Sequence, residues 1–216
     1  MSLDERHGPD GPGTELRTVS DARTMRALAH PVRIALIEAL TLGGAMTATE
    51  AGERIGESPT TCSFHLLQLA KYGLVEEAGG GKGRARPWRL TGIGLGLAAP
   101  EDAEGKLAAA ALLRLARERQ LERYWTWLQS MASYPRRWRE AADDSAYILF
   151  LTAGELEQLK EDFSAMLMPL FLERLADPSK RPAGSVPVEL LLFSYPIALP
   201  AAGDQNAAGQ DEETLA

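Results

Sequence analysis

A turn at Gly56 separates two short helical segments, and this arrangement constrains the fold more than any other feature of the sequence. Thr47 and Glu50 have the T-x-x-E spacing of a capping box, which predicts a short helix before the turn. Ser58-Pro59 supplies an N-cap and a first helical residue for a second helix over 58–71. Two short helices joined by a turn of three or four residues that contains glycine are typical of a helix-turn-helix.

The segments on either side of this pair complete a small domain. Apolar residues recur at helical spacing before and after His30-Pro31, which predicts two preceding helices. Two short strands, 74–78 and 87–91, flank a glycine-rich basic tip over 79–86. A hairpin in this position is the wing of a winged helix-turn-helix, which we therefore predict over 18–91.

The helix 58–71 has two unlike faces. Cys62, Leu66, Leu69 and Ala70 share one face, which is expected in the core. The opposite face and its flanks combine polar groups with an aromatic ring, which suits hydrogen bonds to base edges and contact with thymine methyl groups, although a plain solvent-facing surface is the alternative. The predicted DNA-binding residues are Ser58, Thr60, Thr61, Ser63, Phe64, Gln68 and Lys71 on the helix, and Lys82, Arg84 and Arg86 on the tip.

The rest of the chain predicts a dimerisation or effector domain over 102–196. A long helix is expected over 102–133, followed by strands over 146–152 and 186–195 with a helix between them. Both strands are apolar on both faces, so both faces need a cover. The sequence leaves open whether that cover is the helix between them, the long helix or the same element of a second subunit.

The predicted fold class is α+β: a mainly helical winged helix-turn-helix domain, then a long helix and a small strand–helix–strand domain. Residues 1–17 are expected to be a disordered lead-in and 201–216 an acidic, disordered tail. The formal net charge is −7, but residues 1–100 carry eleven basic and eleven acidic side chains, so the acidity lies in the second half. Local charge therefore does not exclude a polyanionic partner.

Several other classes of protein are disfavoured. One cysteine and three histidines do not assemble a thiolate or imidazole metal site, and neither a metal nor a cofactor is expected. No glycine-rich phosphate loop or nucleophile–base pair points to an enzyme. No apolar run approaches the roughly 20 residues of a membrane span, and residues 1–13 lack the apolar core of a signal peptide, so a cytoplasmic protein is expected.

Three motifs carry a family resemblance. The runs Leu28–Ile34, Ser58–Leu66 and Gly73–Val75 resemble the arsenic-repressor (ArsR-like) winged-helix family over about 18–91. The resemblance implies a homodimeric repressor that reads a palindromic operator in double-stranded DNA. Metal-sensing members carry paired cysteines where this chain has Glu50–Arg54, so the effector is expected to be a small organic molecule or absent. The rival hypothesis is a winged helix that docks proteins without sequence-specific DNA binding.

Overall fold

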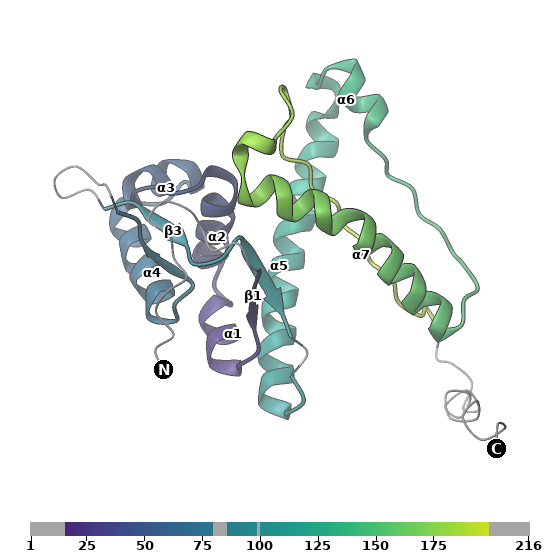
Figure 1. Ribbon diagram of the computed structural model, residues 1–216, viewed down its shortest axis with the longest axis horizontal. Coiled ribbons are helices and arrows are strands. Elements are labelled where there is room, and N and C mark those ends of the chain that lie inside the picture. The colour runs from purple at the N-terminus through teal and green to yellow at the C-terminus, as the bar shows by residue number, and fades with distance from the viewer. Residues whose placement is uncertain (1–15, 80–85, 99, 199–216) are drawn as a thin grey trace.

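Four short helices form the amino-terminal part of the chain (Figure 1). The structure is a computed structural model that describes residues 16–79, 86–98 and 100–198. In chain order the helices are α1 (Ala22–Leu28), α2 (Pro31–Gly43), α3 (Ala48–Ile55) and α4 (Pro59–Lys71). The predicted helix pair is confirmed, because α3 begins at the capping box of Thr47 and Glu50, and Gly56 ends it in the left-handed region at φ 77°.

The core of this part lies between α1, α2 and α4. Its largest completely buried side chains include Met25 of α1, Leu36 of α2, and Leu66 and Leu69 of α4. The apolar stripe that predicted α2 therefore faces inward, as expected for the central helix of the domain.

The predicted hairpin is also present. Strands β2 (Val75–Glu77) and β3 (Trp88–Leu90) pair antiparallel, with Val75 opposite Leu90. Trp88 is buried beneath the hairpin, and its backbone exchanges two hydrogen bonds with Met46, at 3.0 and 2.7 Å. The hairpin is thus attached to the segment just before α3, which fixes its base relative to the helix-turn-helix.

One strand pair corrects the predicted boundaries of the domain. β1 (Leu16–Val19) pairs parallel with β4 (Gly94–Leu97), although residues up to 17 were predicted to be disordered and the domain to end at residue 91. The guanidinium group of Arg17 donates to the carbonyl oxygens of Gly73 and of Tyr72, the latter at 2.8 Å. Arg17 therefore ties β1 to the end of α4, through a long-range contact that local sequence patterns do not reveal.

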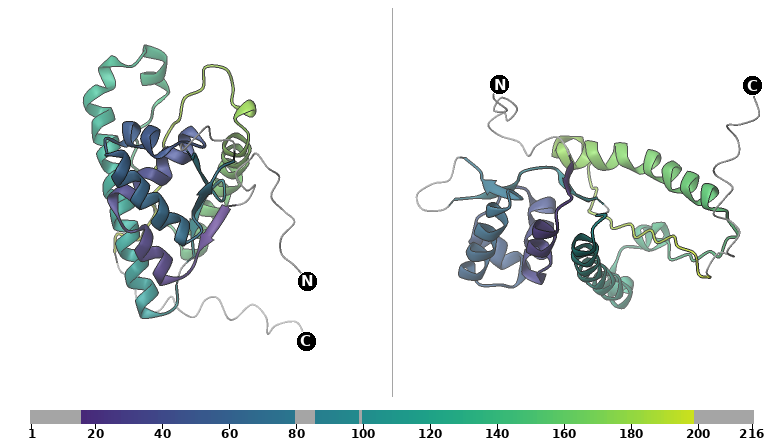
Figure 2. Two further views of the ribbon diagram at one scale, coloured as in Figure 1. Left: turned by 90° about the vertical axis from the view of Figure 1, so that its left-hand side faces the viewer. Right: turned by 90° about the horizontal axis from the view of Figure 1, so that it is seen from below.

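The long helix is confirmed as α5 (Ala103–Ser130), continued by the 3-10 turn η1 (Met131–Ser133). Its first three turns pack on α1 and bury four small or apolar residues, Gly105, Ala108, Ala109 and Leu112. Beyond these turns its side chains are exposed or half-buried. The first part of α5 thus belongs to the core of the amino-terminal domain, and the rest extends away from it (Figures 1 and 2).

The carboxy-terminal prediction is wrong in its strands. After α6 (Arg136–Ala141), helix α7 (Ala153–Ala176) starts at a capping box of Thr152 and Glu155 and is followed by the 3-10 turn η2 (Pro178–Lys180). Neither 146–152 nor 186–195 is a strand. Residues 146–151 and 186–195 have no backbone partners in the described part of the chain, and an extended segment without a paired neighbour does not form a sheet. Over the described ranges, no helix is long and apolar enough to cross a bilayer.

The contacts of Arg17 predict a measurable loss of stability. Replacing Arg17 with Ala leaves the carbonyl groups at the end of α4 without their charged donor, so the free energy of unfolding should fall by about 1–3 kcal/mol in chemical denaturation. Arg26→Ala is the matched control, because Arg26 forms only an exposed ion pair with Glu104, and its loss should cost at most about 1 kcal/mol. Equal effects of the two substitutions would contradict the role assigned to Arg17.

Candidate nucleic-acid interface

Helix α4 presents a polar and apolar face to solvent because its opposite face is completely buried. Cys62, Leu66 and Leu69 have no exposed surface, which fixes the rotation of the helix about its own axis. Phe64 and Leu67 therefore point outward and are 56% and 55% exposed. Two large apolar side chains on an otherwise polar surface are typical of a contact surface.

The predicted helix residues lie around this face in two groups. Thr60 and Lys71 are exposed and share the outer face with Phe64, whereas the side chains on the flanks are half-buried: Thr61, Ser63 and Gln68. Ser58 is exposed at the start of the helix, where its Oγ accepts a hydrogen bond from the N–H of Thr61 at 3.0 Å. Leu67 was left out of the predicted set, although its spacing from Phe64 already placed it on the same face.

The turn before α4 is tight, which sets the angle between α3 and α4. A Cβ atom on Gly52 would lie 2.6 Å from the carbonyl oxygen of Glu57, so the turn packs directly against the α3 backbone. The N–H of Glu57 also donates to the carbonyl oxygen of Gly52 at 3.0 Å. Glycine at position 52 is therefore required for this close approach.

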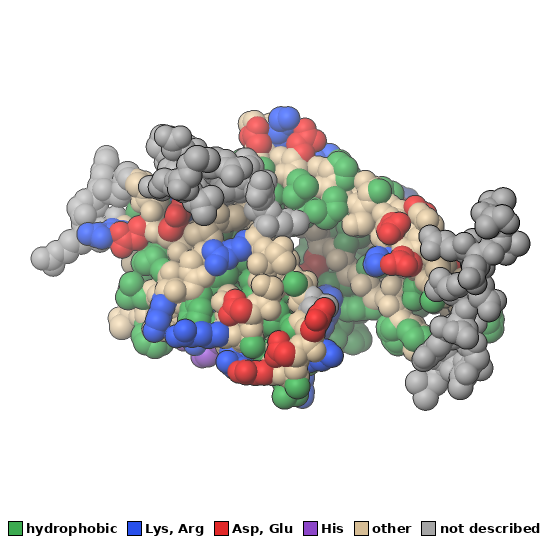
Figure 3. Space-filling view, turned by 60° about the horizontal axis from the view of Figure 1, so that its bottom comes forward, with side chains coloured by type: hydrophobic (Ala, Val, Ile, Leu, Met, Phe, Trp, Pro, Cys, Tyr) green, Lys and Arg blue, Asp and Glu red, His purple; other side chains and the backbone are tan. Residues whose placement is uncertain are grey.

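The hairpin brings basic side chains to the same end of the domain. Lys82 and Arg84, both predicted to bind phosphate, lie outside the described residues. Arg86 is exposed and pairs with Glu77 at 2.8 Å, while Arg89 pairs with Glu76 at 2.9 Å. Exposed ion pairs contribute little, so a phosphate group could replace Glu77 as the partner of Arg86 at small cost. Figure 3 shows Lys and Arg side chains among apolar ones on the left of the molecule, where α4 and the hairpin lie.

Two histidines, His30 at the start of α2 and His65 on the buried side of α4, form hydrogen bonds that require a neutral ring. Nδ1 of His30 accepts a hydrogen bond from the N–H of Val32 at 3.2 Å and thereby caps α2. Nδ1 of His65 accepts from Nε of Arg33 at 3.4 Å, and the two imidazole rings lie 4.4 Å apart. Burial lowers the pKa of each histidine below 6.5, and the charge of Arg33 lowers both further, against a smaller opposite effect of Glu57.

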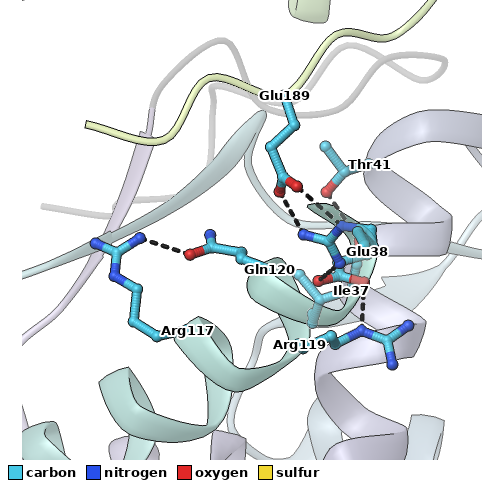
Figure 4. A network of polar contacts seen from close by, with 8 residues as sticks. Ile37, Glu38, Thr41, Arg117, Arg119, Gln120 and Glu189 are labelled. Carbon is cyan, nitrogen blue, oxygen red and sulfur yellow. Dashed lines mark hydrogen bonds and ion pairs between the residues drawn. The ribbon is translucent and has the colours of Figure 1, made fainter. Parts of the chain in front are cut away.

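A cluster of ion pairs connects the amino-terminal domain to the carboxy-terminal segment (Figure 4). Glu38 of α2 accepts from Arg119 at 2.6 Å and from Arg123 at 2.8 Å, both on α5. Arg123 also pairs with Glu189, and this second carboxylate is the main reason that the pKa of Arg123 is raised. The same arginines border a shallow, open hollow with Trp127 and Tyr134.

Comparison with known proteins identifies the motif. Residues 28–78, which include α2 to β2, match a family model described as a helix-turn-helix domain. No curated protein matches the chain. Among solved structures, a MarR family regulator from Neisseria meningitidis is 19% identical over 67% of this chain and 74% of that chain, with a TM-score of 0.27. The chain carries a helix-turn-helix domain, the DNA-binding element of transcription regulators, and this match does not single out the arsenic-repressor family.

The histidine pair predicts a pH dependence of stability. Because the folded protein binds these protons less readily than the unfolded chain, the stabilisation is complete above about pH 6.5 and is lost as the pH falls below it. The lowered pKa values of Asp21 and Glu50 act only in a more acidic range, below their ordinary values of 3.8 and 4.5. Denaturation at pH 7 and pH 5 should show this loss in the native chain and a smaller loss in a His30→Asn, His65→Gln variant. An identical pH dependence in both would refute it.

Proposed function

We propose that this protein is a homodimeric transcription repressor that reads a palindromic operator with α4 and holds the flanking phosphates with the hairpin. The observation that carries the proposal is the outer face of α4, where Phe64 and Leu67 are more than half exposed on a helix whose other face is completely buried. A helix in the major groove uses such a face for apolar contact with thymine methyl groups.

Polar side chains on the same helix would supply discrimination between bases. Gln68 can form two hydrogen bonds with adenine, and Thr61 can bond to a base edge from the flank of the outer face. Lys82 and Arg84 adjoin glycines in the segment between the two strands, where the backbone can approach a phosphate, and Arg86 follows two residues after Arg84. The resemblance of the three sequence motifs to the arsenic-repressor family supports the assignment as a repressor.

A homodimer would place two copies of α4 on two half-sites. The second part of α5 supports this assembly, because Leu121 and Trp125 are large apolar residues that stand exposed on it. Half-sites of helix-turn-helix dimers are spaced by about 10 bp, one turn of the DNA. A small organic effector, if the protein has one, would find a cation and two aromatic rings in the hollow beside Arg119, Trp127 and Tyr134.

A protein-docking module is the second candidate, and one observation favours it. Glu53 and Glu57 are exposed on α3 and on the turn before α4, where they would repel phosphate groups. In that case the apolar pair Phe64 and Leu67 would contact a protein surface. DNA-binding measurements on the variants below separate the two functions.

The assignment of helix to bases and hairpin to phosphates predicts opposite effects of two substitutions. Gln68→Ala should weaken binding to the preferred site by about 1–3 kcal/mol and change binding to random duplex little. Arg84→Ala should weaken both about equally and reduce the slope of log K against log salt by about one per lost contact. Fluorescence anisotropy at several salt concentrations measures both. The assignment would be reversed if Arg84→Ala relaxed the sequence specificity while Gln68→Ala weakened binding to all sequences equally. If neither substitution changed DNA binding, protein docking would be favoured.

Metal ions are predicted to leave DNA binding unchanged. Across residues 16–79, 86–98 and 100–198 there is no group of three His, Cys, Asp or Glu side chains placed to hold an ion. Cys62 is buried, and burial raises the pKa of its thiol, so it is a poor thiolate ligand. Titration of zinc, cadmium or arsenite should change the dissociation constant for DNA less than a few-fold. A tenfold release by any one of them would contradict this.

A further inference from the structure

The chain between α6 and α7 carries five consecutive apolar side chains with no cover. We call Tyr147–Leu151 the arm; its members range from 43% exposed at Leu151 to 99% exposed at Phe150. Figure 1 shows the arm as an extended connection at the edge of the molecule, away from the helical bundle. Successive side chains of an extended chain point to opposite sides, so the arm is apolar on both faces and both face solvent.

A second segment, Val186–Phe193, alternates like a β-strand and is partly covered on one face only. Glu189 pairs with Arg123, and the Phe193 ring lies under the guanidinium group of Arg117 at 4.9 Å, so the odd-numbered residues face α5. The even-numbered residues on the other face are apolar and exposed: Val188 at 66%, Leu190 at 71% and Leu192 at 54%. We call this segment the receiving strand.

The arm and the receiving strand have no backbone partners in the described part of the chain. The receiving strand runs back antiparallel to α7, and the arm leads into the first turn of α7 (Figures 1 and 2). An extended segment with unpaired N–H and C=O groups is a ready site for a second strand.

The exposed apolar area is the size of a stable interface. Because a large aromatic side chain covers about 150–250 Å², the arm and the uncovered face of the receiving strand together expose on the order of 1,000 Å². A standard interface buries about 800 Å² on each partner. The area therefore matches what one partner contributes to a stable dimer.

We propose that the arm of each copy pairs as a β-strand with the receiving strand of a second copy, so that two chains exchange arms about a twofold axis. The occupant is a second copy because each chain offers both one free arm and one partly covered strand-like segment, and a symmetric pair of chains engages both of them in both copies. This inference rests on the homodimer of the proposed function and specifies the segments that hold it.

Charge substitutions test the exchange through the oligomeric state. The native chain should be a dimer by light scattering, and both Phe150→Glu and Leu190→Glu should raise the dimer dissociation constant roughly 100-fold, because each buries an unpaired carboxylate at the interface. Both positions are exposed in the single chain, so neither substitution should unfold it. The variants should have the melting temperature of the native chain when all are diluted until they are monomeric.

Leu107→Glu is the matched control, because Leu107 is 74% exposed on the first part of α5, outside both segments. It should leave the dimer intact. A native chain that stays monomeric at 100 μM (roughly 1,000 times a Kd of about 0.1 μM) overturns the exchange, as does dimerisation that neither Phe150→Glu nor Leu190→Glu weakens.

Disulfide trapping between two tagged populations tests the pairing itself. One population carries Phe150→Cys and the other Val188→Cys, Leu190→Cys or Leu192→Cys, while the native Cys62 is buried and out of reach of oxidants. Mixing and mild oxidation should give a cross-link between the populations at one or more of the three positions. Cross-links only between two Phe150→Cys copies, or none in a protein that is dimeric, would overturn the exchange. A trapped dimer that binds no specific DNA would instead overturn the proposed function.

Discussion

The complete burial of one face of α4 is the constraint on which the rest of the site depends. Cys62, Leu66 and Leu69 fill the core together with α2, and a rotation of α4 that exposed Gln68 fully would bring these side chains into water. Because this rotation is fixed, Phe64 and Leu67 have to stand in solvent. The tight turn after Gly52 then sets the direction in which that surface points, and the backbone contact between Trp88 and Met46 places the hairpin beside it.

The helix-turn-helix and its hairpin could be predicted because their signals are local. The capping boxes at Thr47 and Thr152, the glycine at position 56 and the N-cap at Ser58 each act within four residues. The apolar spacing of α4 was enough to separate its buried face from its outer face. The same periodicity identified Phe64, Thr60 and Lys71 as outward-facing residues, whereas their contacts with DNA are a proposal that rests on chemistry.

The parts that sequence reasoning missed depend on contacts between distant segments. β1 is only four residues long, and its parallel partner β4 lies beyond the whole helix-turn-helix, so neither strand had a local signal. Residues 186–195 were predicted as a strand from their alternation, and the alternation is present, with Glu189 and Phe193 turned to α5. The segment is not a strand because pairing requires a neighbouring chain, which periodicity cannot supply.

The central claim is that two copies of this chain read DNA sequence with α4. Repeated selection of bound duplexes from a random pool, followed by sequencing, tests it most directly. The account predicts one enriched inverted repeat, with half-site centres about 10 bp apart, because each copy of α4 occupies one major-groove half-site. A pool that shows no enriched sequence after selection, or protein that retains duplexes only through salt-sensitive binding without preference, would contradict it.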